Sequence, residues 1–376
     1  MPHSPEPAAG ALPTTAPPLE GVGVRLRALT EDDVQRITEL ATDSQSVRWT
    51  TIPDPYPAEG ARDFVAASRA AWKRGEGSLT WAIEDPAGLF AGQIDLRPAP
   101  ARWEIGYALH PQARGRGLLS AALRTVSAWG FEHGAQTLSL YVARGNWASR
   151  RVAWACGFTV DATLPGWLPG RGTDGPLDAW AATLRPGGPM TPAHRWIVPP
   201  DLAADGLRLR QWRDDDRVTE EPDHPAHFMP PHAAPTPDGL PAWLLRRREF
   251  SADGRSCDWC IADADSDAPI GSIGVFTRDG VIDDQAELGY QLLPSARGRG
   301  LATRAARLAV EHVLAPEADG GLGLRRLAAT SAADNRASNA VLAALGFSLC
   351  GREHSVDELA SGGYGDVLHW ELLRHR

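Results

Sequence analysis

An internal repeat constrains this chain more than any other feature. The segment EIGYALHPQARGRGL (Glu104–Leu118) agrees with ELGYQLLPSARGRGL (Glu287–Leu301) at 11 of 15 positions without a gap. Three further blocks match in the same order: VRLR at 24–27 with LRLR at 207–210, TWAI at 80–83 with DWCI at 258–261, and NWASRRVAWACGF at 146–158 with NRASNAVLAALGF at 335–347. Four blocks in one order indicate a duplicated domain and not a solenoid of short repeats.

The repeat divides the 376 residues into two domains of ordinary globular composition, with 43% hydrophobic and 23% charged residues. We expect an N-terminal domain over 21–185 and a C-terminal domain over 206–376. The preceding residues 1–20 contain six prolines, which cannot donate backbone hydrogen bonds, so this segment is predicted to be a disordered tail. Residues 186–205 are rich in proline and glycine and are predicted to form a linker.

The pattern within each copy predicts an α/β fold in which helices cover a mixed sheet. Strand-like alternation at the start of each copy is followed by acidic segments, Thr30–Asp33 and Asp214–Asp216, which are typical of a helix start. Helical patterns then cover 61–73, 118–133, 241–250 and 301–314, and strand patterns lie between and after them.

A glycine-rich loop follows the central strand of each copy and leads into a helix. It runs from Gln112 to Gly117 and from Ser295 to Gly300, and arginines alternate with the glycines. Glycines at this spacing allow a tight turn that exposes consecutive N–H groups at a helix N-terminus, where the helix dipole also favours an anion. A merely flexible turn with solvated arginines is the alternative, but the same pattern in two copies favours a phosphate site.

Other phosphate-binding motifs fit this chain poorly. The dinucleotide fingerprint needs a third glycine where the chain has Ala121 and Thr303, and no G-x-x-x-x-G-K-[ST] occurs. A nucleotide-dependent dehydrogenase is therefore disfavoured.

The net charge of −9 argues against binding to nucleic acid or anionic lipid by bulk charge, so we expect neither as a partner. Only four cysteines, no signal peptide and no apolar run of about 18 residues predict a cytoplasmic protein.

The glycine loop after a strand and the later N-x-x-S…GF block together resemble the GNAT superfamily of N-acetyltransferases. The LRLR opening, the E-[IL]-G-Y strand and the RGRGLAT run most resemble its RimJ/RimL-type branch. The resemblance covers residues 22–185 and 206–376. It implies two tandem acyl-CoA N-acyltransferase domains that use acetyl-CoA as co-substrate and need no metal.

By this resemblance, main-chain N–H groups of the two loops bind the pyrophosphate of acetyl-CoA. Strand N–H groups near Leu109 and Leu292 stabilise the oxyanion, and Asn146 and Asn335 hold the pantetheine. The second copy departs from the family pattern at Ser295, which has little weight because the backbone makes the cradle. The implied acetyl-CoA-binding residues are Leu109, Gln112, Arg114, Gly115, Arg116, Gly117, Leu118 and Asn146 in the first copy, and Leu292, Arg297, Gly298, Arg299, Gly300, Leu301 and Asn335 in the second.

The resemblance also implies catalytic residues. Glu104 and Glu287 match a strand glutamate that acts as a base through water, with a solvated edge carboxylate as the alternative. Ser149 and Ser338 would protonate or hydrogen-bond the departing sulfur, although Asn-x-x-Ser is equally a plain helix cap. Many relatives place a tyrosine acid in the following helix. None stands at the corresponding positions here, so the general acid stays open.

We therefore predict an acetyltransferase that passes an acetyl group directly to a primary amine, on a protein N-terminus or a small molecule. Neutralising an α-amine of pKa about 7.7–8.0 at pH 7 costs about 1 kcal/mol, against about 4.6 kcal/mol for a lysine. This difference favours acceptors of low pKa. A regulatory protein that senses acyl-CoA without turnover is the alternative. The sequence specifies neither the acceptor nor the oligomeric state.

Two weaker patterns are set aside as metal sites. Cys257 and Cys260 form a C-x-x-C, but strand alternation turns the two thiols to opposite faces. His224, His227 and His232 lie in a proline-rich loop with no fixed metal-ligand spacing.

Overall fold

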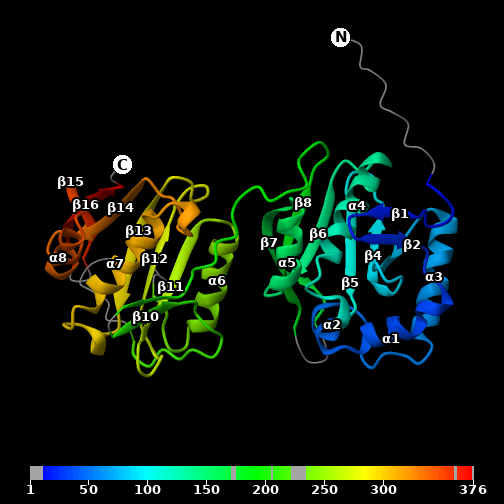
Figure 1. Ribbon diagram of the computed structural model, residues 1–376, viewed down its shortest axis with the longest axis horizontal. Helices are drawn as coiled ribbons and strands as arrows, with labels where there is room; N and C mark the ends of the chain where they lie inside the picture. Colours follow the sequence, from blue (N-terminus) through cyan, green and yellow to red (C-terminus); the bar gives the residue numbers. More distant parts are fainter. Residues whose placement is uncertain (1–11, 171–174, 205, 222–233, 360–361, 375–376) are drawn as a thin grey trace, which may run out of the picture. The chain divides into compact units, whose positions relative to one another are not determined.

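The chain folds into two compact units, Met1–Ala193 and His194–Arg376 (Figure 1). The structure is a computed structural model that describes residues 12–170, 175–204, 206–221, 234–359 and 362–374. In the described residues, each unit contains an eight-stranded mixed sheet with helices packed on it. The predicted duplicated α/β fold is therefore confirmed.

The sheet of the N-terminal unit has the order β1-β2-β3-β4-β5-β6-β8-β7. All of its neighbouring strands pair antiparallel except β5 and β6, which are parallel. Its strands are β1 (Leu19–Gly21), β2 (Val24–Arg27), β3 (Leu79–Glu84), β4 (Phe90–Arg97), β5 (Trp103–Leu109), β6 (Leu138–Ala143), β7 (Thr159–Leu168) and β8 (Leu177–Leu184). Its helices are α1 (Val34–Thr42), α2 (Ser44–Trp49), α3 (Gly60–Arg74), α4 (Leu118–Glu132) and α5 (Trp147–Ala155), with 3-10 turns at Glu31–Asp33 and Pro111–Ala113.

The C-terminal unit repeats this sheet in the order β15-β16-β14-β13-β12-β11-β10-β9, with β13 and β14 as the parallel pair. Its strands are β9 (Leu202–Ala204), β10 (Leu207–Arg210), β11 (Ser256–Asp263), β12 (Pro269–Phe276), β13 (Gln285–Leu292), β14 (Arg326–Ala332), β15 (Ser348–Glu358) and β16 (Tyr364–Leu373). Its helices in the described residues are α6 (Leu240–Ala252), α7 (Leu301–Leu314) and α8 (Arg336–Ala344), with 3-10 turns at Pro294–Ala296 and Glu317–Asp319.

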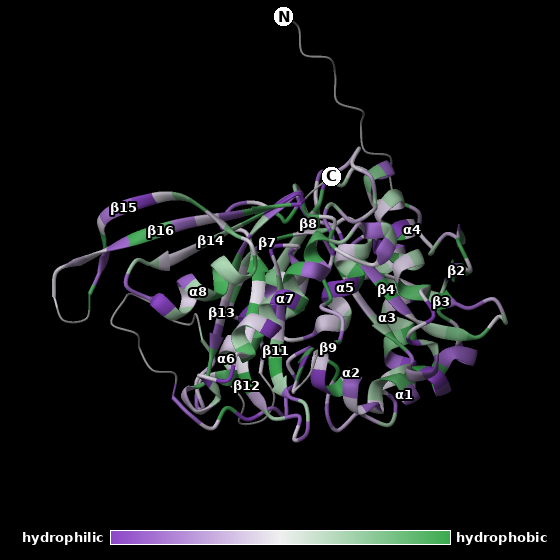
Figure 2. Ribbon diagram, turned by 60° about the vertical axis from the view of Figure 1, so that its left-hand side comes forward, coloured by the Kyte–Doolittle hydropathy of each residue, from purple (hydrophilic) through white to green (hydrophobic). Residues whose placement is uncertain are grey.

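The core lies between the central strands and the helices on both faces of the sheet. Trp81 of β3 contacts Trp129 of α4, with ring centroids 5.1 Å apart. The next residue, Ala82, packs in a cluster with Val65 of α3. Successive strand residues point to opposite faces. The Ala82 face therefore packs against α3, and the Trp81 face packs against α4 and also against Trp72 near the end of α3, with ring centroids 4.7 Å apart. In the C-terminal domain, Figure 2 shows that the central strand β11 is mostly hydrophobic, whereas the edge strand β15 carries hydrophilic stretches.

Two prolines that precede the predicted domain starts at residues 21 and 206 accept hydrogen bonds from buried tryptophans. The indole N–H of Trp81 donates to the carbonyl of Pro17 at 3.0 Å, and the indole N–H of Trp259 donates to the carbonyl of Pro200 at 2.8 Å. A buried indole N–H needs an acceptor, and proline retains its carbonyl. Strands β1 and β9 follow directly, inside the segments predicted as tail and linker. Residues 1–11 of the predicted tail lie outside the described part.

The helices predicted at 61–73, 118–133, 241–250 and 301–314 are confirmed as α3, α4, α6 and α7. One predicted helix start is wrong. No helix begins at Asp214–Asp216, which lie in a turn, and none follows in the described residues up to 221. Asp216 instead accepts two hydrogen bonds from Arg210, at 2.9 and 2.7 Å, in a buried ion pair. The acidic pattern therefore reflected this ion pair. None of the helices in the described part of the chain has the length and hydropathy that a membrane span needs.

Candidate active site

The two parallel strands at the centre of each sheet separate soon after they begin to pair. Strand β5 pairs with β6 only through Trp103 and Glu104, although it continues to Leu109. Strand β13 pairs with β14 only through Gln285–Glu287, although it continues to Leu292. Beyond these points the backbone groups on the inner side of β5 and β13 are outside the ladder. They are therefore able to hydrogen-bond an extended ligand that carries amide groups.

The glycine loop lies at the end of β5 and of β13. Gly115 and Gly117 have φ of 73° and 75°, and Gly298 and Gly300 have φ of 76° and 70°. A Cβ at any of the four would meet nothing within 4 Å, so the left-handed backbone, and not lack of space, requires glycine. In the described part of the chain, the N–H groups of residues 115–118 make no hydrogen bond of normal geometry. They are unpaired donors at the N-terminus of α4.

The loop arginines contact other groups of their own domains. Arg114 donates to the carboxylate of Asp43 and, at 3.1 Å, to Ser46 Oγ. Arg116 donates to Asp85 at 3.0 Å. In the C-terminal domain, Arg297 Nε donates to the Leu292 carbonyl at 3.2 Å. Carboxylates therefore already hold both guanidinium groups of the N-terminal loop.

The remaining predicted loop residues lie where the loop meets its supports. The N–H of Gln112 donates to His110 Nδ1 at 3.3 Å, and its side-chain oxygen accepts from Arg36 at 3.4 Å. Leu118 and Leu301 are the buried first residues of α4 and α7. Together they fix the position of each loop against its domain.

Both asparagines of the N-x-x-S block act as helix caps. Asn146 Oδ1 accepts the N–H of Ser149 at 3.2 Å, and Asn335 Oδ1 accepts the N–H of Ser338 at 3.0 Å. The capping interpretation is therefore correct for these side-chain oxygens. The serine side chains are not consumed by the cap, which uses only their N–H groups.

A tyrosine that sequence reasoning missed lies beside each serine. Tyr107 of β5 donates its hydroxyl to the Ser149 carbonyl at 3.2 Å, and Tyr290 of β13 lies 2.9 Å from Ser338 Oγ. Burial raises the pKa of both phenols, so each keeps its proton at neutral pH. The tyrosine comes from the repeated E-[IL]-G-Y strand, not from the helix where relatives carry it. Its presence in both copies of that motif was the available signal.

The two strand glutamates lie on the opposite face and are paired with arginines. Glu104 accepts a hydrogen bond from Arg97, and its side chain is 38% exposed. Glu287 is bound by Arg278 through Nε at 3.0 Å and Nη2 at 3.1 Å, and Thr330 donates to it at 3.2 Å. Neither carboxylate is a free base in this state. Glu287 is the more tightly held of the two.

The cysteines of the C-x-x-C belong to two different core clusters on opposite faces of β11. Burial raises the pKa of Cys257 well above its usual value and that of Cys260 to about 12. Neutral, buried thiols on opposite faces do not bind one metal ion. His224, His227 and His232 lie outside the described residues.

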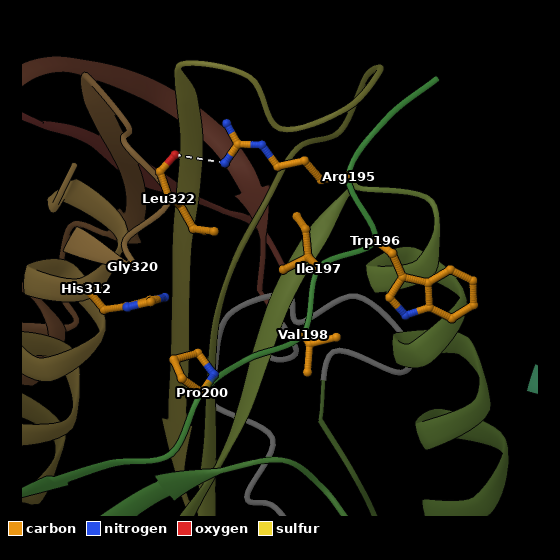
Figure 3. A pocket seen from close by; sticks show the side chains of 8 residues that line it. All are labelled: Arg195, Trp196, Ile197, Val198, Pro200, His312, Gly320 and Leu322. Carbon is orange, nitrogen blue, oxygen red and sulfur yellow. Dashed lines mark hydrogen bonds between the residues drawn. The ribbon is translucent and has the colours of Figure 1, made fainter. Parts of the chain in front are cut away.

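A cavity of about 280 Å³ in the C-terminal domain is separate from this site (Figure 3). It is lined by residues of the segment 195–200 and by His312, Gly320 and Leu322. His312 lies eleven residues after the start of α7, about 16 Å along the helix from the glycine loop. The equivalent residue of α4 is the larger Trp129.

Parting parallel strands, a glycine loop with unpaired N–H groups and a helix that begins at that loop define an α/β domain whose geometry suits a phosphorylated, amide-containing ligand. The family model described as Acetyltransferase (GNAT) domain matches residues 24–159 and 206–348. The chain therefore belongs to the GNAT acetyltransferase family and contains two of its domains.

Several solved structures resemble parts of the chain. An acetyltransferase (GNAT family) from Bacillus anthracis is 18% identical, with a TM-score of 0.40, and the match covers 45% of this chain and 98% of that one. A ribosomal-protein-S5-alanine acetyltransferase from Vibrio fischeri is 21% identical, with a TM-score of 0.38, over 47% and 97%. RimJ from Mycobacterium smegmatis, in complex with CoA-disulfide, is 22% identical, with a TM-score of 0.40, over 45% and 86%. A comparison with curated proteins gives no match.

Proposed function

We propose that this protein is an acetyl-CoA-dependent N-acetyltransferase that acts on a primary amine, with one acetyl-CoA site in each domain. The observation that carries the proposal is the pair of loops in which two left-handed glycines precede α4 and α7. Unpaired N–H groups at a helix N-terminus suit a diphosphate. The unpaired inner sides of β5 and β13 suit the amide groups of pantetheine. Membership of the GNAT family supports an acyltransferase.

The reaction needs an oxyanion donor and a proton for the departing thiolate. We assign the oxyanion to strand N–H groups near Leu109 and Leu292, the last residues of β5 and β13. The thiolate proton comes from Ser149 or Ser338. In the C-terminal domain, Tyr290 lies within hydrogen-bond distance of Ser338 Oγ and can restore that proton. No covalent enzyme intermediate is required.

The amine must be neutral when it attacks the thioester. Glu104 and Glu287 are our candidates for accepting its proton through water, as the resemblance implies. Each must first release its arginine, because the hydrogen bonds to the guanidinium occupy carboxylate oxygens that would otherwise accept the proton. This requirement is greater for Glu287, which accepts three hydrogen bonds.

The bound state of Glu287 also favours a second candidate function. A C-terminal domain that binds acyl-CoA without turnover, as a sensor or regulatory site, would keep the glycine loop and leave this carboxylate in its ion pair. For the acetyltransferase, the candidate acceptors are a protein N-terminus and a small-molecule amine. The four cysteines are free thiols, which supports a cytoplasmic location.

Calorimetry with coenzyme A and thiol release with acetyl-CoA test the proposal together. We expect the full chain to bind coenzyme A and to release free thiol when a panel of primary amines is added. Binding without thiol release across the panel would favour the sensor. Absence of coenzyme A binding would refute both functions.

A further inference from the structure

Each domain has a buried aspartate in the same row of paired residues across its sheet, Asp95 in the N-terminal domain and Asp258 in the C-terminal domain. The two do not occupy equivalent strands: Asp95 is on β4, whereas Asp258 is on β11, the counterpart of β3. In each domain the side chain of this aspartate is 12% exposed, and it leans over a glycine of the next strand. The matching serines of the two repeats, Ser78 and Ser256, interact with it. In the N-terminal domain this row contains Thr80 of β3, Asp95 of β4 and Gly106 of β5. In the C-terminal domain it contains Asp258 of β11, Gly274 of β12 and Gly289 of β13.

In the N-terminal domain this carboxylate shares one arginine with Glu104. Arg97 donates through Nη1 to Glu104 and through Nε to Ser78 Oγ at 3.2 Å. Its Nε lies only 3.0 Å from Asp95 Oδ2, yet that oxygen is buried and has no hydrogen-bond partner. The residue Asp95 as a whole is 8% exposed. Two carboxylates and one guanidinium leave one negative charge uncompensated.

The titration of Asp95 agrees with this imbalance. Burial, opposed by Arg97 and assisted by the charge of Glu104, raises its pKa to about 6. Burial also raises the pKa of Asp258 in the C-terminal domain, but there no second carboxylate adds to the rise as Glu104 does at Asp95.

The C-terminal domain lacks this imbalance among its described residues. Arg278 binds Glu287 through two nitrogens, so that pair is neutral. Asp258 lies one strand farther from the glutamate and has Arg247 at 3.5 Å. The residue aligned with Arg97 is Phe276, whose ring lies 3.1 Å from where a Cβ on Gly289 would be. An aromatic ring therefore covers the strand beside Glu287.

We propose that the two domains select different acceptors: Asp95, Arg97 and Glu104 form a cation-binding site for amines that carry a second positive group, whereas Phe276 gives the C-terminal site a preference for amines on an apolar body. This inference rests on the proposed function, because it identifies the acceptor class of the same sites. In the N-terminal domain it assigns Glu104 to binding the second cation of the acceptor, in place of the role of base.

The shared arginine explains how a cation would bind. Glu104 is accessible, with 38% of its side chain exposed, whereas Asp95 is not. When a ligand ammonium takes the place of Arg97 at Glu104, the guanidinium turns fully to Asp95 and satisfies its orphaned oxygen. The bound cluster then has two carboxylates and two cations. A neutral alkyl group at the same position would leave the negative charge uncompensated.

The test uses the full chain and a matched pair of acceptors, 1,5-diaminopentane and pentylamine. Gly300→Val silences the C-terminal loop and Gly117→Val the N-terminal loop, because valine disfavours their left-handed backbone. We expect the N-terminal site to favour the diamine in kcat/KM by about tenfold or more, as for one hydrogen bond to a charged group. Asp95→Asn should bring that ratio close to one. The C-terminal site should favour pentylamine.

Asp258→Asn is the matched control, since it removes the equivalent buried carboxylate where no excess charge exists. It should leave the acceptor ratio of the C-terminal site unchanged. Equal ratios in the two sites, or a ratio that survives Asp95→Asn, would overturn the inference while acetylation itself stands. Calorimetry of both amines with the CoA-loaded chain tests, without turnover, whether the diamine binds more tightly than pentylamine. Tighter diamine binding that Asp95→Asn weakens about tenfold supports the inference even if neither amine is acetylated, and equal binding contradicts it.

Discussion

The hydroxyl of Tyr290 lies 2.9 Å from Oγ of Ser338, which joins the central strand of the C-terminal domain to the first turn of α8. In the N-terminal domain the equivalent Tyr107 donates to the carbonyl of Ser149, at 3.2 Å. The same two residue types meet in both domains, but only Ser338 has its hydroxyl bonded to the phenol. The two serines therefore differ in how a proton can reach them.

This difference predicts unequal effects of removing the tyrosine. Tyr290→Phe should lower kcat of the C-terminal site about tenfold without changing its affinity for coenzyme A, because Ser338 Oγ loses the hydroxyl with which it can exchange a proton. Ser338→Ala should lower kcat about a hundredfold or more, within the usual range for a lost general acid. Steady-state thiol release in the Gly117→Val background measures both. Tyr107→Phe should have a smaller effect in the N-terminal site.

Ser348→Ala is the control for the serine substitution, since this residue is exposed at the start of β15. The cap itself is preserved in Ser338→Ala, because Asn335 accepts a backbone N–H. Full activity of Ser338→Ala would show that the serine serves only the cap.

Replacing a loop glycine should weaken coenzyme A binding in one domain only. Gly117 and Gly300 have φ of 75° and 70°, and a side chain there costs roughly 1–2 kcal/mol in the left-handed region. We expect Gly117→Ala and Gly300→Ala each to raise one dissociation constant about tenfold. The double substitution should raise both. Isothermal titration calorimetry, which also gives the number of sites, measures the change.

Gly23→Ala and Gly280→Ala are matched controls for these substitutions. Both glycines have a left-handed backbone, with φ of 71° and 69°, and open space where a Cβ would lie. They carry the same conformational cost away from the glycine loops. If they weaken binding as much as the loop variants, the loops have no special role.

The glycine loops were predictable because their conformation is set locally. Two glycines between a strand and a helix determine the turn regardless of the rest of the fold. The contact between Tyr107 and Ser149 was not predictable in this way, because 42 residues separate them. Their meeting depends on how α5 packs beside β5. The E-[IL]-G-Y motif showed a tyrosine in both copies, but not which helix it faces.

Two hydrogen bonds near the predicted domain starts were not predictable for a similar reason. Pro17 and Pro200 lie in proline-rich segments that were predicted to be a tail and a linker. The carbonyl of each accepts a hydrogen bond from a buried tryptophan more than 50 residues away. The sequence also did not show that Arg97 and Arg278, which do not align in the repeat, reach Glu104 and Glu287. Such pairing depends on strand register, which composition does not specify.

The buried ion pair near the start of each domain should contribute strongly to stability. Arg210 and Asp216 are 3% and 2% exposed, so Asp216→Asn leaves a guanidinium without its buried partner. We expect the free energy of unfolding of the C-terminal domain to fall by about 3 kcal/mol, the lower end for breaking a buried pair, since Asp267 still binds Arg210. Urea unfolding followed by tryptophan fluorescence measures the loss.

Asp201→Asn is the control for Asp216→Asn, because it removes the partner of Arg208 in an exposed pair. Its effect should stay below about 1 kcal/mol. Equal losses of stability in Asp201→Asn and Asp216→Asn would contradict the assignment.

The equivalent carboxylate of the N-terminal domain, Asp33, links stability to pH. Burial raises its pKa, but hydrogen bonds from Arg27 and Thr30 outweigh burial, so the pKa lies below 3.8. The stabilising contribution of Asp33 is complete above about pH 4 and is lost as the pH falls below that value.

The buried Asp95 should give the N-terminal domain the opposite dependence on pH. Its pKa is raised from 3.8 to about 6, chiefly by burial. Between these values the folded state binds more protons than the unfolded state, so the free energy of unfolding falls as the pH rises from about 4 to about 6. The decrease from this one group is about 1–3 kcal/mol. Asp95→Asn should remove this slope and stabilise the domain at pH 7.

Hydrogen exchange of β4 amides, measured between pH 4 and pH 7 and corrected for intrinsic exchange rates, reports this stability within the full chain. Asp32→Asn is the control, since Asp32 is an exposed residue of the same domain. The control should keep the wild-type slope. If Asp95→Asn instead destabilises the domain at pH 7, the carboxylate is fully compensated by Arg97, and the excess negative charge beside Glu104 does not exist.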